Sequence, residues 1–287
     1  MTAQNSKQNA CILSWRKILA TINSKSRPFP SRQGHRRKLL LARGESETRA
    51  VSVLSQWDAL PESEGMLASV KKRQIFLDQP IMAGGRKYFV KVYVYKDLPR
   101  VLESLFYLSD AQRNYTTLEF LKACGVSVTP PLGLVHEYRA GIVTRSFLML
   151  EGLDRAEDYK EYLHKVDVFD TAARQQFFHS LGTSLGMLHK AQVFTKDTDK
   201  NTMVEERGKT FRFHFLDFDS TFPWRVPNYR RTVINFKKYL TPGHRIEEQD
   251  IERFVAAYCL QRDVKSWQHA LLESTLRFFQ ENRNRYL

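Results

Sequence analysis

Apolar and polar residues alternate along several short segments in the first half of the chain. Residues 74–77 and 87–95 follow this two-residue period, and Gly84 and Gly85 between them are typical of a hairpin turn. Residues 132–137 and 142–150 show two more strand patterns, joined by a short polar connection. The pattern predicts an antiparallel sheet of four or five strands.

The rest of the chain is dominated by helical spacing. Residues 171–190 repeat apolar side chains every three or four positions after Asp170, a candidate N-cap. Residues 246–260 and 264–286 carry similar stripes, and residues 97–124 form one earlier helical pattern. An α+β fold is therefore predicted, with the strands and the helices largely segregated along the chain.

Two polar clusters flank a predicted hairpin. Asp197 and Asn201 precede its first strand, and Asp217 and Asp219 follow the alternating run that ends at Phe215. Because a hairpin returns its second strand to the start of the first, these side chains should gather at one end of the ribbon. Their oxygens suit Mg²⁺, which points to phosphoryl transfer. The alternative is a solvated turn, since Asp and Asn favour turns on their own account.

Lys91 lies in the middle of the strand predicted over residues 87–95. The alternation places it on the same face as Phe89 and Tyr93, opposite Val90 and Val92. An ammonium among aromatic side chains needs an anionic partner or a route to water, because burying an unpaired charge is costly. The simpler alternative is an exposed lysine whose stem covers apolar surface.

The order of these features resembles that of the protein-kinase-like fold: a strand lysine, a helix, a hairpin, a D-x-x-x-N loop and a D-F-D strand end. The form LDFD followed by an Arg-rich stretch, and the segment SDAQRNYTTLEFLKACGVSVTPPLGL, resemble the bacterial lipopolysaccharide core kinases, the Kdo and heptose kinases. The resemblance covers residues 72–260. It implies a protein-kinase-like fold with an antiparallel-sheet N-lobe at residues 66–150 and a mainly helical C-lobe at residues 151–287.

The resemblance also implies an ATP-dependent phosphotransferase that acts on a sugar hydroxyl of a lipopolysaccharide core, with ATP and Mg²⁺ as cofactors. Asp197 takes the role of the catalytic base, and Lys91 that of the phosphate-binding lysine. The backbone of Leu150, Glu151 and Gly152 matches the hinge that meets adenine. The implied metal ligands are Asn201, Asp217 and Asp219.

Three departures from that family's pattern favour an alternative, a pseudokinase that serves as a binding or scaffold protein. Thr195 stands where a His is usual, and Asn201 follows Asp197 by four residues where five is usual. Asn114 occupies the helix position that usually offers a Glu to the strand lysine, and Glu119 is a candidate substitute.

Positive charge is concentrated at the start of the chain. The 287-residue sequence has a net charge of +14, and its first 44 residues contain ten Lys or Arg and no acid. Residues 1–50 are therefore predicted to be a disordered basic tail apart from a short helix near residues 12–22. This tail could attract anionic lipid or nucleic acid, or have no binding role; no nucleic acid is expected, because no nucleic-acid-binding signature accompanies the charge.

A second basic stretch lies beyond the predicted metal ligands. Arg225, Arg230 and Arg231 are interleaved with aromatic side chains, which suits an anionic, phosphorylated sugar substrate but is also common in a solvated loop. The three cysteines show no zinc-site or disulfide spacing, so a reducing compartment is expected. No apolar run approaches the roughly 18 residues of a membrane span. We expect a cytoplasmic protein that can touch the inner face of the inner membrane.

Overall fold

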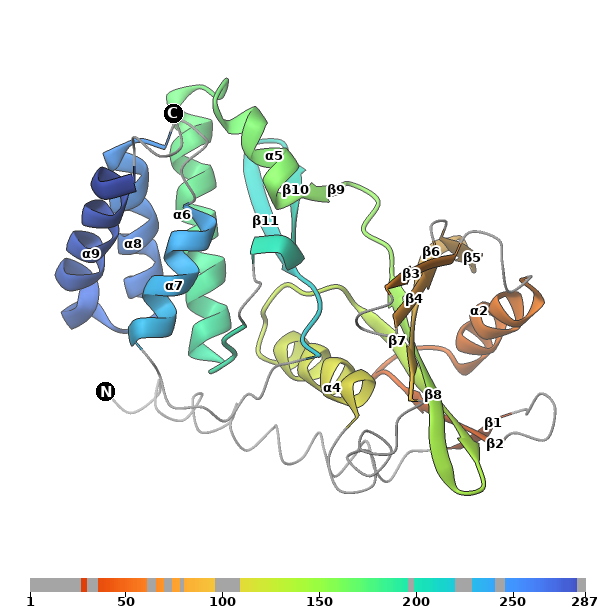
Figure 1. Ribbon diagram of the computed structural model, residues 1–287. Helices are drawn as coiled ribbons and strands as arrows, with labels where there is room; N and C mark the ends of the chain where they lie inside the picture. Colours follow the sequence, from red (N-terminus) through yellow and green to blue (C-terminus); the bar gives the residue numbers. More distant parts are fainter. Residues whose placement is uncertain are drawn as a thin grey trace. The chain divides into compact units, whose positions relative to one another are not determined.

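The chain folds into two compact units (Figure 1). The first contains Met1–Ala123, Thr129–Asp154 and Phe218–Ser220, and the second contains Cys124–Val128, Arg155–Asp217 and Thr221–Leu287. The computed structural model describes residues 27–29, 36–60, 66–69, 74–77, 80–95, 109–195, 199–219, 229–240 and 246–282. The short segment 218–220 returns to the first unit, so the two aspartates of the D-F-D motif belong to different units.

An antiparallel sheet forms the centre of the first unit. Its strands lie in the order β1-β2-β7-β8-β6-β4-β3, and β5 pairs with β6. The α+β class is confirmed, but the described residues form eight strands here rather than four or five. The additional strands have three to six residues, and none of them was identified from its period. Their bounds are Arg27–Phe29 (β1), Arg36–Leu41 (β2), Met66–Ser69 (β3), Gln74–Leu77 (β4), Ile81–Ala83 (β5), Arg86–Val94 (β6), Pro131–Arg139 (β7) and Ile142–Glu151 (β8).

The predicted Gly-Gly turn exists, but it joins β5 to β6. Gly84 and Gly85 have φ angles of +57° and +74°, which glycine adopts without steric cost. β4 also pairs with β6, through the register Ile75↔Val92. The strand at residues 74–77 was therefore predicted correctly, whereas its connection to β6 was not.

The prediction of disorder is wrong for residues 36–50. β2 pairs with β7 along its whole length and buries Leu39 and Leu40. Arg37, counted in the basic tail, is 5% exposed and binds Glu137 at 3.0 Å and Asp58 at 2.5 Å. The composition of residues 1–50 did not reveal this strand, because the acids that pair with Arg37 lie outside that segment. The helix predicted near residues 12–22 lies outside the described residues.

Two helices cover opposite faces of this sheet (Figure 1). α2 (Glu47–Ala59) packs Val53, Leu54 and Trp57 into a core with Val90 and Val92. α4 (Asp110–Ala123) contacts β6, β7 and β8, and its buried Asn114 reaches Tyr93 on the other face of β6. The face of β6 that carries Lys91 is therefore the face that α4 covers.

The second unit contains the helices and a small sheet. Its elements are β9 (Ala156–Asp158), α5 (Tyr159–Val166), α6 (Thr171–Lys190), the 3₁₀ turn η1 (Asp199–Asn201), β10 (Thr202–Arg207), β11 (Thr210–Phe215), α7 (Tyr229–Tyr239), α8 (Glu248–Arg262), η2 (Lys265–Trp267) and α9 (Gln268–Asn282). Asp170 caps α6 as predicted, since its side chain accepts a hydrogen bond of 2.7 Å from the Ala173 amide. The β10–β11 hairpin confirms the second predicted ribbon.

Helices α6 and α8 approach closely enough to require glycine. A Cβ on Gly182 would lie 2.2 Å from the Phe254 carbonyl oxygen. Phe177, Phe178, Leu181 and Leu185 complete the buried face of α6, as its sequence period predicted. This contact fixes the helical framework behind the β10–β11 ribbon, which packs on α6.

The cysteines differ from expectation. Cys124 is disulfide-bonded, whereas Cys259 is a buried free thiol. Spacing along the sequence did not reveal this, because a disulfide depends on which thiols meet in the fold.

Candidate functional site

Lys91 is buried and has a carboxylate partner. Its side chain on β6 is 5% exposed, and its Nζ lies 3.7 Å from Oδ2 of Asp219 and 5.0 Å from the centre of the Tyr93 ring. All three residues belong to the first unit. The expectation of an anionic partner is met, and the alternative of an exposed, solvated lysine is wrong.

The segment after β11 is held by α4. The Phe218 amide donates to Oδ1 of Asn114 at 3.0 Å, and the Asp219 carbonyl oxygen accepts from Nε of Arg113 at 2.9 Å. Phe218 is fully buried. Two neighbouring side chains of one helix therefore fix the backbone that carries the partner of Lys91.

Glu119 does not replace the glutamate that the resemblance led us to expect on this helix. Its Oε2 accepts a hydrogen bond of 3.1 Å from the Arg43 amide, and its Oε1 is buried without a hydrogen-bond partner. Burial raises the pKa of this carboxyl above its ordinary value. The suggestion that Glu119 pairs with Lys91 is wrong, because the helix turns it toward the chain that follows β2.

Asn201 and Asp217 lie at the same end of the β10–β11 ribbon, in the second unit. The pair Thr202↔Phe215 is the last in the ladder, and beyond it the Leu216 amide donates to the Asn201 carbonyl oxygen at 2.8 Å. The predicted hairpin therefore brings these two residues together. Asp197, the expected catalytic base, lies outside the described residues.

Asp217 has an unusual backbone conformation. Its φ angle is +35°, in the region that residues other than glycine seldom adopt. Such a conformation typically costs about 1–3 kcal/mol and is concentrated at functional sites. It therefore supports a specific role for this residue.

The donor set at this end of the ribbon suits a hard cation only in part. Asn201 and Asp217 offer the amide and carboxylate oxygens that Mg²⁺ binds. Within the described ranges, however, no three His, Cys, Asp or Glu side chains are grouped as a metal site. The two residues can hold Mg²⁺ together with phosphate oxygens and water, the usual arrangement for this ion.

The 3₁₀ turn η1, which ends at Asn201, is anchored by polar contacts that the sequence did not suggest. Asp199 is 5% exposed and lies 3.3 Å from Nζ of Lys160. The Thr202 hydroxyl, fully buried, bonds the Tyr239 hydroxyl at 2.7 Å. These contacts fix the start of β10 and hence the place of Asn201.

The predicted hinge is part of β8 and its immediate continuation. The Glu151 amide donates to the Pro130 carbonyl oxygen at 2.9 Å, and the Gly152 amide donates to the Lys87 carbonyl oxygen at 2.7 Å. Leu150 pairs with Phe89 in the sheet. The amides of Glu151 and Gly152 are therefore already hydrogen-bonded within the protein. An adenine bound at the predicted hinge would have to pair with other backbone groups.

Phe89 is an exposed aromatic residue beside Lys91 and a candidate site residue that the sequence alone did not suggest. It lies two residues before Lys91 on the same face of β6 and is 41% exposed. Its ring also approaches Gly152, where an added Cβ would fall 3.1 Å from Cε2. The two-residue period was the signal that could have identified it.

The predicted substrate arginines are only partly described. Arg230 is exposed and Arg231 half-buried on α7, while Arg225 lies outside the described residues. Arg230 lines a groove of about 670 Å³ between α7 and α9, together with Lys237 and Arg277. Both described arginines belong to the second unit.

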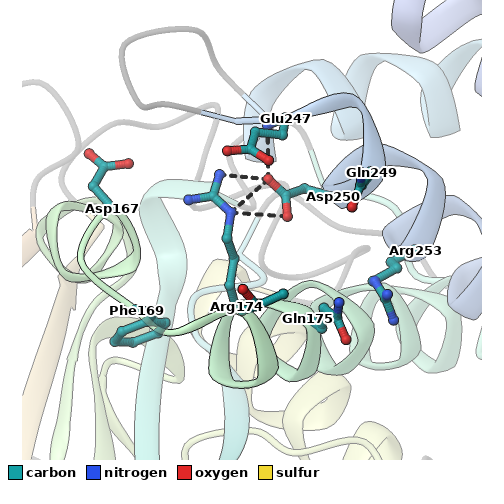
Figure 2. A pocket seen from close by; sticks show the side chains of 9 residues that line it. Asp167, Phe169, Arg174, Gln175, Glu247, Gln249, Asp250 and Arg253 are labelled. Carbon is teal, nitrogen blue, oxygen red and sulfur yellow. Dashed lines mark hydrogen bonds and ion pairs between the residues drawn. The ribbon is translucent and has the colours of Figure 1, made fainter.

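A smaller cavity, of about 180 Å³, lies where α6 and α8 begin. Figure 2 shows Arg174 reaching across it to Asp250, with which it forms hydrogen bonds of 2.6–3.1 Å. The Glu247 amide also donates to Asp250, at 2.8 Å. These polar groups hydrogen-bond to one another. The Arg174–Asp250 pair is therefore a structural link between the two helices.

His189 is also structural, as its place at the end of α6 suggested. Its ring is fully buried, 2.8 Å from the Tyr258 hydroxyl and 3.0 Å from the Asn235 amide nitrogen. Burial, reinforced by Arg262, holds the pKa of this imidazole well below its ordinary value. The ring is therefore neutral near pH 7.

Comparison with known proteins identifies a family and a similar fold. A family model described as the lipopolysaccharide kinase (Kdo/WaaP) family matches residues 56–258. A solved structure titled "WaaP in complex with acyl carrier protein" has a TM-score of 0.56 and 16% sequence identity, and the alignment covers 85% of this chain and 98% of that chain. This likeness confirms the protein-kinase-like fold. No curated protein matches the chain significantly.

Proposed function

The chain belongs to the lipopolysaccharide kinase (Kdo/WaaP) family, and from that premise we propose that it transfers the γ-phosphoryl group of ATP to a sugar hydroxyl of a lipopolysaccharide core. The family consists of kinases that act on lipopolysaccharide. ATP as the phosphate donor, and a hydroxyl of Kdo or heptose as the acceptor, are the parts that we add.

The buried Lys91–Asp219 pair is the observation that carries this proposal. A lysine that is 5% exposed on a sheet strand, with a carboxylate 3.7 Å away, has its ammonium held in one place, whereas the end of an exposed lysine would be mobile. In this role Lys91 binds and orients nucleotide phosphates. Phe89, on the same face of β6, provides an exposed ring that can pack on the base.

The remaining assignments follow the order of the motifs. Asn201 and Asp217 hold Mg²⁺, which offsets the negative charge of the phosphates when it is bound. Asp219 keeps Lys91 in place or supports the metal. Asp197 takes the proton of the acceptor hydroxyl as that oxygen attacks the γ-phosphorus and the bond to ADP breaks, which makes Asp197 the catalytic base.

Cationic side chains support an anionic acceptor. Arg230 and Arg231 lie on α7, which also carries Lys237 and Lys238 and no acidic residue. Guanidinium groups bind phosphate and carboxylate bidentately, and lipopolysaccharide cores carry both. We assign Arg225, Arg230 and Arg231 to this acceptor. The described helices contain no segment long and apolar enough to cross a membrane.

A thermal-shift titration with Mg²⁺ and ATP tests the nucleotide site. We expect ATP to raise the melting temperature of the wild-type protein, because a ligand that binds only the folded state stabilises it. Lys91→Met should lose most of this shift. Lys38→Met, an exposed lysine on β2 of the same sheet, should keep it.

An absent shift in the wild-type protein would contradict the proposal and favour the pseudokinase that the departures at Thr195 and Asn114 suggest. An equal shift in both lysine variants would remove Lys91 from the site while leaving ATP binding intact.

A further inference from the structure

Asn114 joins three parts of the first unit. It is fully buried on α4, its Nδ2 donates to the Tyr93 hydroxyl on β6 at 3.0 Å, and its Oδ1 accepts from the Phe218 amide at 3.0 Å. One short side chain therefore ties the helix, the strand and the segment that follows β11.

Both partners of Asn114 adjoin the Lys91–Asp219 pair. The Tyr93 ring centre lies 5.0 Å from the Lys91 ammonium, within the range of a cation–π contact. Phe218 immediately precedes Asp219, whose carboxylate lies 3.7 Å from that ammonium. The position of each member of the pair therefore depends on a group that Asn114 holds.

An amide suits this position for a chemical reason. It can accept a hydrogen bond from a backbone N–H and donate one to a hydroxyl at the same time. An ionised carboxylate can only accept, and a leucine of similar size can do neither. A buried N–H left without an acceptor is costly, so the position requires a side chain that accepts from the Phe218 amide, as an amide or a carboxylate can and a leucine cannot.

We propose that Asn114 is a positioning residue, which fixes the backbone of the D-F-D segment against β6 so that Asp219 provides the counter-charge of Lys91. This assigns a role to the departure from the family pattern on α4. The carboxylate that pairs with the lysine comes from the segment after β11. The helix contributes Asn114, and we call its hydrogen bond to the Phe218 amide the clamp. The kinetic part of this inference rests on the function proposed above.

Hydrogen exchange tests the clamp without any requirement for turnover. In Asn114→Leu we expect the Phe218 amide to exchange at least about tenfold faster than in the wild-type protein, because it loses its acceptor. In Asn114→Asp protection should persist, since the carboxylate still accepts from Phe218 and the Tyr93 hydroxyl can turn to donate. Thr116→Val, which removes a buried hydroxyl on the same helix, should leave Phe218 protected.

Steady-state kinetics test the consequence for the site. Asn114→Leu should lower kcat/KM for ATP by roughly 10–100-fold, the scale expected when reacting groups shift by about 1 Å. Asn114→Asp should stay within about fivefold of the wild-type protein, and Thr116→Val should match it. Rescue by the aspartate separates positioning from a general loss of stability.

The outcomes distinguish the two proposals. Unchanged protection of Phe218 in a folded Asn114→Leu protein overturns the clamp, whatever the activity. Faster exchange with unchanged kinetics, or an aspartate variant as impaired as the leucine variant, overturns the positioning role. A wild-type protein without ATP turnover contradicts the proposed function, and the exchange data then decide the clamp alone.

Discussion

At the scale of single residues, the cost of burying ionisable groups explains how this site is arranged. Lys91 is nearly excluded from solvent, and burying an ammonium is costly unless a carboxylate or an aromatic face offsets the lost hydration. Asp219 and Tyr93 provide these contacts. The alternation around Lys91 allowed either an anionic partner or an exposed lysine, and only its place in the order of the motifs favoured the first.

The role of Asn114 could not be predicted from the sequence. Compared with the family pattern, Asn114 showed only that the usual glutamate is missing from this helix. Its two hydrogen bonds involve residues 21 positions earlier and 104 positions later in the chain. Spacing along one helix carries no information about such partners.

His136 gives a residue-scale prediction about pH. Burial, with a contribution from Lys38, lowers the pKa of this imidazole to about 4, and the ring bonds the Ser146 hydroxyl at 2.7 Å. Below the unfolded pKa of about 6.5, the unfolded chain therefore binds a proton that the folded protein does not. We expect this group to lower the free energy of unfolding by about 2 kcal/mol between pH 7.5 and pH 5.

Urea denaturation at the two pH values measures this effect. His136→Asn should reduce the pH dependence, because asparagine can still bond Ser146 but does not titrate. His179→Asn, at an exposed position of α6, should keep the wild-type dependence. An identical loss of stability at pH 5 in His136→Asn and in the wild-type protein would contradict the assignment.

At the scale of elements, the longest segments were predicted most closely. The nine-residue strand β6 and the 20-residue helix α6 show clear periods and were predicted close to their bounds. β1, β3 and β5 have three or four residues and show none. Local pattern also cannot specify which strands pair, so the Gly-Gly turn was assigned to the wrong partner of β6.

The Arg174–Asp250 pair is the element-scale prediction. It links α6 to the start of α8, and its side chains are 12% and 6% exposed. Removing one partner leaves a nearly buried charge unpaired, which typically costs about 3–5 kcal/mol. We expect Arg174→Met and Asp250→Asn each to lower the free energy of unfolding on that scale, and the double variant to lose less than the sum.

Chemical denaturation of the three variants measures the coupling. Arg277→Met provides a matched control, because it breaks an exposed pair with Glu273 that is 67% and 57% exposed. Such a pair is typically worth less than about 1 kcal/mol. Single variants of the Arg174–Asp250 pair as mild as this control would show that the link carries little stability.

At the scale of the whole molecule, the start of the chain contributes to the first unit. Leu39 and Leu40 are 2% and 6% exposed, and burying side chains of this type is worth about 1.5–3 kcal/mol each. Losing the burial of both side chains would cost a free energy comparable with the net stability of a typical domain. The concentration of basic residues concealed this role, because charge counts give no indication of the acids that pair with Arg37.

Truncation tests that contribution. Removing residues 1–50 should abolish cooperative unfolding of the first unit, because it deletes β2 and the buried Ala50. Removing residues 1–10 deletes no described element and serves as the control. If residues 51–287 melted at the wild-type temperature in circular dichroism, β2 would not be an integral part of the sheet.

Transfer of the γ-phosphoryl group from labelled ATP to purified glycolipids with Kdo- or heptose-containing cores is the most direct test of the proposed function. The account predicts Mg²⁺-dependent labelling of one glycolipid by the wild-type protein. Asp217→Asn should lower that rate by at least about 100-fold at an unchanged circular dichroism spectrum, because it removes a charged metal ligand. Wild-type labelling of no glycolipid, or full activity in Asp217→Asn, would contradict it.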